Sequence, residues 1–246
     1  MTVSNFSPKP FFPSAGSKSA VASRVSPWLT PVVYPLGCRL VLPLYFRNLI
    51  VHGVEHIPTE GPVVLAPTHR ARWDALTVAY AAGRWATGRD LRFMVSANEV
   101  RGIQGWFIRR LGGFPVNPQN PAIASLRLGV EVLQNREMLV IFPEGGIFRD
   151  RQVHPLKPGL ARLALQAETS QPGLGVQIVP MSITYGNDSV SYGCGMTIRI
   201  GAPLSAIDYA QGTPKESAKQ LTADLQHAIQ SLDGGFLTPQ PISVNL

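Results

Sequence analysis

The chain has 246 residues, of which 45% are hydrophobic and 15% are charged. This length suits one sizeable core and is short for two independent catalytic domains, so we expect a single domain. The low charged fraction excludes a disordered or highly solvated protein and indicates apolar surface that needs a partner, for which a membrane is one candidate.

The net charge of +7 is unevenly distributed, because residues 1–160 carry 18 basic and 9 acidic residues. The basic excess is densest around His69, where we expect an anionic partner. Anionic lipid and a phosphorylated small molecule both fit this charge. The chain has no zinc-finger spacing, no RNP-like aromatic pattern and no long basic run, so we expect no nucleic acid partner.

The amino terminus has the composition of a disordered tail over residues 1–27, which are rich in serine and proline and contain no acid. An organelle transit peptide is the weaker alternative. Two cysteines, Cys38 and Cys194, are too few for a Cys-rich metal site or a disulfide framework. We expect both to be free thiols in a reducing compartment.

Residues 28–50 are apolar and long enough to raise the question of a membrane span, since about 20 residues cross a bilayer. Three prolines remove backbone donors, and two arginines would each cost roughly 2.5–3.5 kcal/mol near mid-bilayer. These residues are Pro31, Pro35, Pro43, Arg39 and Arg47. We therefore expect an N-terminal amphipathic helical segment, broken into pieces, that docks on an anionic membrane surface as a peripheral attachment. The alternative, that residues 28–50 pack on the domain as ordinary core, stays open.

Apolar runs and amphipathic stretches alternate from residue 51 to residue 235, which predicts an α/β domain with a central, mostly parallel sheet flanked by helices. Expected strands cover 62–67, 91–97, 138–142, 176–183 and 196–201. Expected helices cover 75–87, 100–111, 120–133 with Asn120 and Pro121 at its start, 158–168, and a last helix after Pro214. Residues 236–246 have the composition of a loose tail.

His69 follows the first of these strands, and Asp74 lies five residues later in THRARWD. On an ideal helix five residues turn about 500°, which leaves the two side chains roughly 140° apart. We therefore expect His69 in the loop and Asp74 in the first helical turn, where the carboxylate can fold back onto the imidazole. One ring nitrogen would then be free as a general base. The alternative is a loop histidine beside a capping aspartate.

A second polar group, FPEGG at 142–146, also follows an apolar strand. Glu144 places a carboxylate at the expected mouth of the sheet, and Gly145 lets backbone amides approach a ligand closely. A cluster of donors suited to phosphate comes next: Arg149, Arg151, His154 and Lys157. Further basic residues stand at expected loops or helix ends: Arg70, Arg72, Arg109 and Arg110. The alternative for 142–157 is a solvated loop of mixed charge.

Other kinds of active site find less support. His52, His56, His69 and Glu144 show no established metal-ligand spacing, so we expect no metal and place His52 and His56 on a strand. No serine or cysteine stands in a nucleophile elbow, which favours direct transfer over a covalent enzyme intermediate.

The segments THRARWD, LGGFPVNP, FPEGGIFRD and IVPMSI, in this order over about residues 60–185, resemble the four sequence blocks of the glycerolipid acyltransferases, the family of 1-acylglycerol-3-phosphate acyltransferases. The resemblance implies an enzyme on the cytoplasmic or plastid stromal face of a membrane. It would transfer an acyl group from a thioester of acyl-carrier protein or coenzyme A to the sn-2 hydroxyl of lysophosphatidate, without a cofactor. By the same resemblance His69 is the catalytic base, Asp74 orients it, Glu144 and Gly145 bind the acceptor, and Pro180 shapes the acyl site.

Two blocks depart from the family pattern. Asn117-Pro118 stands where the second block usually ends with an arginine, and Gly146-Ile147 stands where the third continues with Thr-Arg. We expect nearby cations to hold the acceptor's phosphate instead, namely Arg149, Arg151 or Lys157, with Arg72 also in contact with substrate. Glycerol-3-phosphate or another lysophospholipid is the alternative acceptor, and a non-catalytic membrane-binding scaffold is the alternative from a different class.

Overall fold

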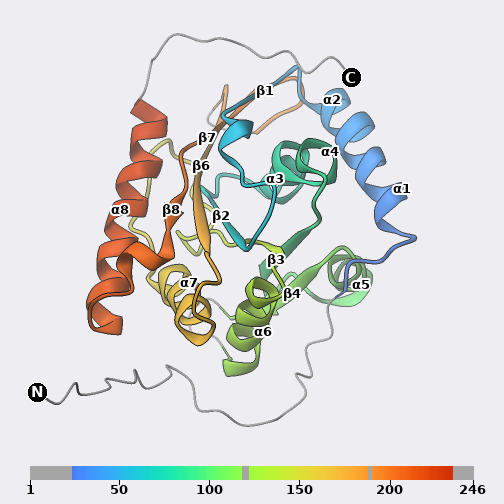
Figure 1. The fold of residues 1–246 in the computed structure, drawn as a ribbon. Coiled ribbons are helices and arrows are strands. Elements are labelled where there is room, and N and C mark those ends of the chain that lie inside the picture. The colour runs from blue at the N-terminus through green and yellow to red at the C-terminus, as the bar shows by residue number, and fades with distance from the viewer. Residues whose placement is uncertain (1–23, 118–121, 188–189, 235–246) are drawn as a thin grey trace, which may run out of the picture.

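The computed structural model of the chain describes residues 24–117, 122–187 and 190–234, which form a central sheet flanked by helices (Figure 1). The strands are β1 (Asn48–His52), β2 (Val63–Pro67), β3 (Leu91–Ser96), β4 (Gly113–Val116), β5 (Met138–Val140), β6 (Gln177–Tyr185), β7 (Gly195–Ile200) and β8 (Leu204–Ser205). The longer helices are α3 (Asp74–Ala82), α5 (Gly102–Arg110), α6 (Ile123–Gln134), α7 (Gly159–Ser170) and α8 (Pro214–Gly234). Short helical elements are α1 (Thr30–Pro35), η1 (Leu36–Val41), α2 (Leu42–Tyr45), η2 (Val54–His56), α4 (Arg84–Thr87) and η3 (Ala206–Tyr209).

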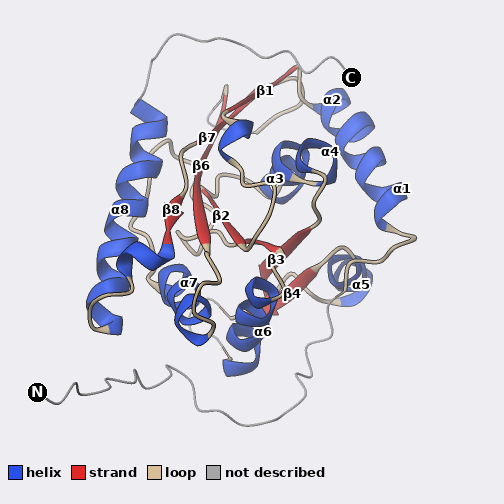
Figure 2. Cartoon of the chain, viewed as in Figure 1, coloured by secondary structure: helices blue, strands red, loops and turns tan. Residues whose placement is uncertain are grey.

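The sheet has the strand order β1-β7-β6-β2-β5-β3-β4, and β8 pairs with the beginning of β6. All pairs are parallel except those that β7 and β8 make with β6. Figure 2 shows the strands between two groups of helices. The expected α/β architecture with a mostly parallel sheet is therefore confirmed. The carboxyl ends of β2, β3 and β5 meet at one edge, which is where ligand sites of such sheets form.

Alternating side chains of the strands supply two cores, one on each face of the sheet. Val63 and Leu65 of β2 belong to the core beneath α3 and the amino-terminal helices. Val64 and Ala66 belong to the core beneath α6, α7 and α8. Both faces are covered, so the central strands β2 and β5 are apolar and buried throughout, as in buried parallel sheets.

Pro180 lies in the middle of β6, a position that proline normally avoids. β8 pairs with residues 177 and 178 of β6, and β7 pairs with residues 181–185. Pro180 falls between these two registers, and its carbonyl accepts from the N–H of Gly201 at 3.0 Å. Proline has no backbone N–H to donate, and Pro180 stands where β6 changes its partner from β8 to β7.

Residues 30–45, which we call the N-terminal segment, are helical throughout and change pitch at the π-helical turn η1. The expectation of helix over 28–50 is wrong at its end, because residues 48–50 belong to β1. One face of the segment is buried, with Tyr34, Cys38 and Leu42 in contact with the domain, while the leucines on the opposite face are exposed. Packing as ordinary core therefore accounts for the buried face alone, whereas an amphipathic helix accounts for both faces.

Three further expectations need correction. The helix expected over 75–87 is two helices, because the chain breaks at Gly83. His56 lies in η2 rather than on a strand, and its Nδ1 contacts the carbonyl of Ile200 at 2.8 Å. Residues 24–26 pair with residues 109–111, so the disordered tail expected over 1–27 is wrong at its end. Asn120 and Pro121, and the expected tails over 1–23 and 236–246, lie outside the described residues.

Candidate active site

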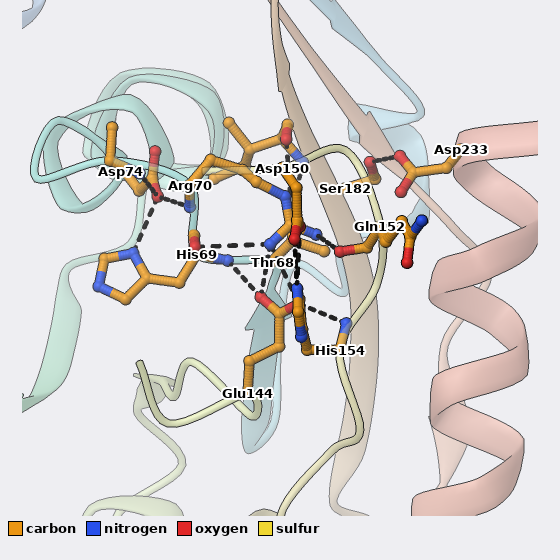
Figure 3. A network of polar contacts seen from close by, with 12 residues as sticks. Thr68, His69, Arg70, Asp74, Glu144, Asp150, Gln152, His154, Ser182 and Asp233 are labelled. Carbon is orange, nitrogen blue, oxygen red and sulfur yellow. Dashed lines mark hydrogen bonds and ion pairs between the residues drawn. The ribbon is translucent and has the colours of Figure 1, made fainter. Parts of the chain in front are cut away.

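His69 lies in the loop after β2, and Asp74 is the first residue of α3, as the spacing predicts. The Nδ1 atom of His69 is 2.8 Å from Oδ2 of Asp74 (Figure 3). The same carboxylate oxygen accepts from the backbone N–H groups of Arg70 at 2.6 Å and Ala71 at 2.8 Å. Asp74 therefore shapes the loop and orients the imidazole at once, which unites the two roles considered for it.

The Asp74 side chain is completely buried, so its charge depends on these donors. Its second oxygen, Oδ1, accepts from the hydroxyl of Tyr185 at 2.6 Å. Tyr185 is the last residue of β6 and belongs to none of the segments noted in the sequence. Burial and the nearby Asp74 carboxylate raise the pKa of the Tyr185 hydroxyl above its usual range, so this group acts as a donor.

Glu144 lies behind His69, and only 2% of its surface is exposed. Its oxygens accept from the His69 N–H at 2.8 Å and the His154 N–H at 2.9 Å, and from Nη1 of Arg70 at 3.0 and 2.9 Å (Figure 3). Arg70 is also buried, and its Nη2 donates to the carbonyl of Gln152 at 3.0 Å. The Glu144 carboxylate thus faces protein groups and fixes the backbone on both sides of the site. We call Arg70, Asp74 and Glu144 the rear network.

A further polar contact joins β6 to α8. The hydroxyl of Ser182 on β6 donates to the carboxylate of Asp233 (Figure 3). Burial raises the pKa of the Asp233 carboxyl, and this effect outweighs the opposing hydrogen bond from Ser182. The end of α8 is therefore hydrogen-bonded to β6.

In front of His69 lies a cavity of about 1120 Å³, which we call the His69 cavity. Its lining is mainly apolar and comes from α3, α5, α6, α7 and β3, including Leu76, Phe93, Ile108, Leu126, Leu160 and Leu163. Phe142 stacks on the His69 ring with centroids 4.0 Å apart and fixes its front face. Nε2 of His69 makes no hydrogen bond within the described part of the chain, and Figure 3 shows it pointing away from Asp74.

The expected binding residues divide between two places. Gly145, Lys157 and Arg72 line the His69 cavity. Arg149 and Arg151 instead line a separate cleft of about 20 Å³ beside Tyr185 and Arg70. Pro180 lies in β6 and is not among the described residues that line either space. The structure therefore brings together the dyad, Gly145 and two of the expected cations.

Gly145 has a φ of +71°, a conformation that favours glycine. A Cβ atom at this position would lie 2.7 Å from Nζ of Lys157. The glycine thus lets the lysine cross the loop toward the cavity. Arg72 is largely exposed and donates to Glu99 at 2.6 Å, so its charge is already paired at the cavity rim.

An apolar surface surrounds the helices that line the cavity. Trp28, Leu36, Leu40 and Leu44 are exposed in and just before the N-terminal segment, and Ile103, Trp106 and Phe107 are exposed on α5. The guanidinium of Arg110 lies 4.4 Å from the Trp106 ring and 6.0 Å from the Trp28 ring, which connects the two regions. Across the described residues, no helix is both long and apolar enough to span a bilayer.

Cys38 and Cys194 are both free and buried. Burial raises the pKa of the Cys38 thiol to about 11, so this thiol is unreactive at neutral pH. In the ranges that the structure describes, no cluster of three His, Cys, Asp or Glu side chains is placed to hold a metal ion.

Comparisons with known proteins agree with this geometry. The family model "Acyltransferase" matches residues 48–184. The 1-acyl-sn-glycerol-3-phosphate acyltransferase of Bacillus subtilis is 26% identical over 187 residues, covering 74% of this chain and 87% of that protein. The protein of the same name from Streptococcus pneumoniae is 29% identical over 158 residues, covering 57% of this chain and 53% of that protein. The chain thus matches about half the length of the pneumococcal relative.

A solved structure has the same fold. The 1-acyl-sn-glycerophosphate acyltransferase of Thermotoga maritima superposes with a TM-score of 0.62 at 20% sequence identity, covering 86% of this chain and 82% of that one. The family model extends from β1 almost to the end of β6 and includes both the dyad and Glu144. The chain therefore belongs to the acyltransferase family.

Proposed function

We propose that the protein transfers a fatty acyl group from an acyl thioester to the sn-2 hydroxyl of lysophosphatidate, giving phosphatidate at a membrane surface. One observation carries the proposal: a histidine oriented by a buried aspartate opens onto a large apolar cavity. The names of the bacterial relatives support lysophosphatidate as the acceptor.

The proposed chemistry uses His69 as a general base. Nε2 removes the proton from the acceptor hydroxyl while the oxygen attacks the thioester carbonyl, and such a base contributes typically 10²–10⁴-fold in rate. The tetrahedral intermediate then collapses, the C–S bond breaks, and the thiol leaves with the proton from His69. Asp74 holds the imidazole and stabilises its charged form during this step. The extensive bonding of Asp74 favours this mechanism over a non-catalytic scaffold.

The lining of the His69 cavity suggests where the two substrates bind. Aliphatic side chains from several helices suit an acyl chain, because they bury it without leaving polar groups unpaired. Lys157 and Arg72 line the same cavity and are the cations that we assign to the acceptor's phosphate. Gly145 provides the room that Lys157 needs. The acyl donor is a thioester of acyl-carrier protein or coenzyme A.

The exposed apolar side chains of the N-terminal segment and α5 support membrane attachment. Val33 and Tyr34 of the segment and Ile108 of α5 also line the His69 cavity. A lipid that leaves the bilayer beneath these helices would therefore enter the cavity without crossing water. We expect peripheral attachment that carbonate or high salt partly releases.

Radiolabelled acyl-coenzyme A and acyl-acyl-carrier protein should be offered to purified protein with liposomes that contain one acceptor at a time. The acceptors are lysophosphatidate, lysophosphatidylcholine and lysophosphatidylglycerol, with glycerol-3-phosphate added in solution. We expect thioester-dependent formation of phosphatidate, at a rate that is about 10²–10⁴-fold lower in the His69→Ala variant. Acylation of glycerol-3-phosphate alone would instead match two other relatives, the mitochondrial glycerol-3-phosphate acyltransferases of mouse and rat.

A further inference from the structure

The hydroxyl of Tyr185 occupies the one side of Asp74 that His69 and the loop amides leave open. His69 Nδ1 and the N–H groups of Arg70 and Ala71 all contact Oδ2 of Asp74. Among the described residues, Oδ1 accepts from Tyr185 alone, at 2.6 Å. A carboxylate held at both oxygens cannot rotate, whereas one held at a single oxygen can turn about its last bond.

The Tyr185 ring is itself fixed by aromatic packing. Only 8% of the residue is exposed, and its ring stacks on Phe46 with centroids 5.7 Å apart. Phe46 also packs edge-to-face on Trp73, the residue before Asp74, at 5.7 Å. The hydroxyl is therefore presented to Asp74 from a rigid support, and ordering it costs little further entropy.

We propose that Tyr185 is a positioning residue for acyl transfer, which holds the Asp74 carboxylate in place and sets the basicity of His69 through it. This inference rests on the proposed function, because it assumes that His69 is the base. Tyr185 touches neither substrate nor the reacting atoms in this role. Its effect reaches the reaction through Asp74.

The charge on Asp74 connects the tyrosine to the histidine. A hydroxyl that donates to Oδ1 withdraws part of the carboxylate's charge from the imidazole. When the hydroxyl is removed, the carboxylate attracts a proton on His69 more strongly, so the imidazolium persists to higher pH. The other titratable or charged groups around the pair are Arg70 and Glu144 behind it, Arg72 and Lys157 at the cavity, and the Cys194 thiol near Tyr185.

Tyr185→Phe removes the hydroxyl and keeps the ring that packs on Phe46. We expect kcat to fall roughly tenfold, since hydrogen bonds to charged groups are the stronger ones, while the KM for the thioester stays within about twofold. We also expect the acid limb of the kcat/KM profile to move to higher pH. Tyr192→Phe is the matched control, because Tyr192 packs on Tyr45 in the same aromatic group but is exposed.

An NMR titration of labelled histidine tests the inference without any substrate, with the His69 signal identified by its loss in His69→Ala. The His69 titration midpoint should move to higher pH in Tyr185→Phe and stay unchanged in Tyr192→Phe. Unchanged kcat and midpoint in Tyr185→Phe would overturn the inference. A loss of kcat that accompanies a fall in Tm, with no shift of the pH profile or the midpoint, would also overturn it. Near-normal turnover in His69→Ala would instead contradict the proposed mechanism, whatever Tyr185 does.

Discussion

The two sides of His69 are built in opposite ways. Behind the ring, the rear network buries two carboxylates and a guanidinium, and nearly every polar atom has a protein partner. In front, the His69 cavity is large and mainly apolar, with its cations at the rim. The rear therefore provides a fixed geometry that does not depend on ligand, while the front provides volume that a flexible lipid chain can fill. Catalysis needs the first property and lipid binding the second.

The strongest test of this comparison removes the His69 imidazole, which contacts the rear network and lines the cavity. His69→Ala should reduce turnover by about 10²–10⁴-fold, because the proton acceptor is lost. Thioester consumption with lysophosphatidate measures the effect. Tm and liposome binding should stay close to those of the unsubstituted protein, and a near-normal rate would contradict the proposed mechanism.

A second test concerns the rear alone. Glu144→Ala leaves the buried Arg70 guanidinium without its carboxylate, and breaking a buried ion pair costs about 3–5 kcal/mol. Urea denaturation should show this loss in the free energy of unfolding. Glu99→Ala is the matched control, because Glu99 pairs with an arginine whose side chain is 77% exposed, and surface pairs contribute about 0–1 kcal/mol. Similar losses in the two variants would refute a rigid rear network.

A third test concerns the approach to the front. Leu36 and Leu40 are half exposed in the N-terminal segment, and burying a leucine contributes about 1.5–3 kcal/mol. Replacing both with serine should weaken binding to anionic liposomes roughly a hundredfold in a sedimentation assay. Ile207→Ser in η3 is the control, since Ile207 is equally exposed but stands on an element that packs against α7 and α8. Equal weakening by the control would mean that this segment is not the contact surface.

The smallest expected effect distinguishes the two sets of cations. Lys157→Ala should raise the KM for lysophosphatidate roughly tenfold, because a charge-assisted contact to phosphate is lost. The KM for the thioester should hardly change. Arg149→Ala should leave both values unchanged, because Arg149 lines the cleft beside Tyr185 instead of the His69 cavity. The reverse result would move the phosphate site to that cleft.

Short-range features of this chain were predictable from sequence. The H-x4-D spacing places His69 and Asp74 correctly once a loop is assumed between strand and helix, and the apolar runs give most of the sheet. The orientation of Glu144 was not predictable, because a loop carboxylate can face substrate or protein with the same sequence. Tyr185 left no signal either, since its contact with Asp74 depends on β6 lying beside β2.

The separation of Arg149 from Lys157 has a similar origin. Both lie in one loop, but between them the His154 amide donates to Glu144, and the two cations line different spaces. Proximity in sequence therefore overstated proximity in space. The turn η1 also escaped prediction, because helical periodicity does not distinguish a π-helical turn from an α-helical one.

The pairing of β1 has a consequence for the order of folding. Among the described strands β1 pairs with β7 alone, although most of the chain separates them. Phe46, which lies between the N-terminal segment and β1, likewise stacks on a residue distant in sequence, Tyr185 of β6. Contacts this distant in sequence cannot form until the ribosome has released nearly the whole domain, and they close slowly. Among the described strands, β1 is therefore the first to be synthesised and one of the last to pair, so its edge stays unpaired through most of translation.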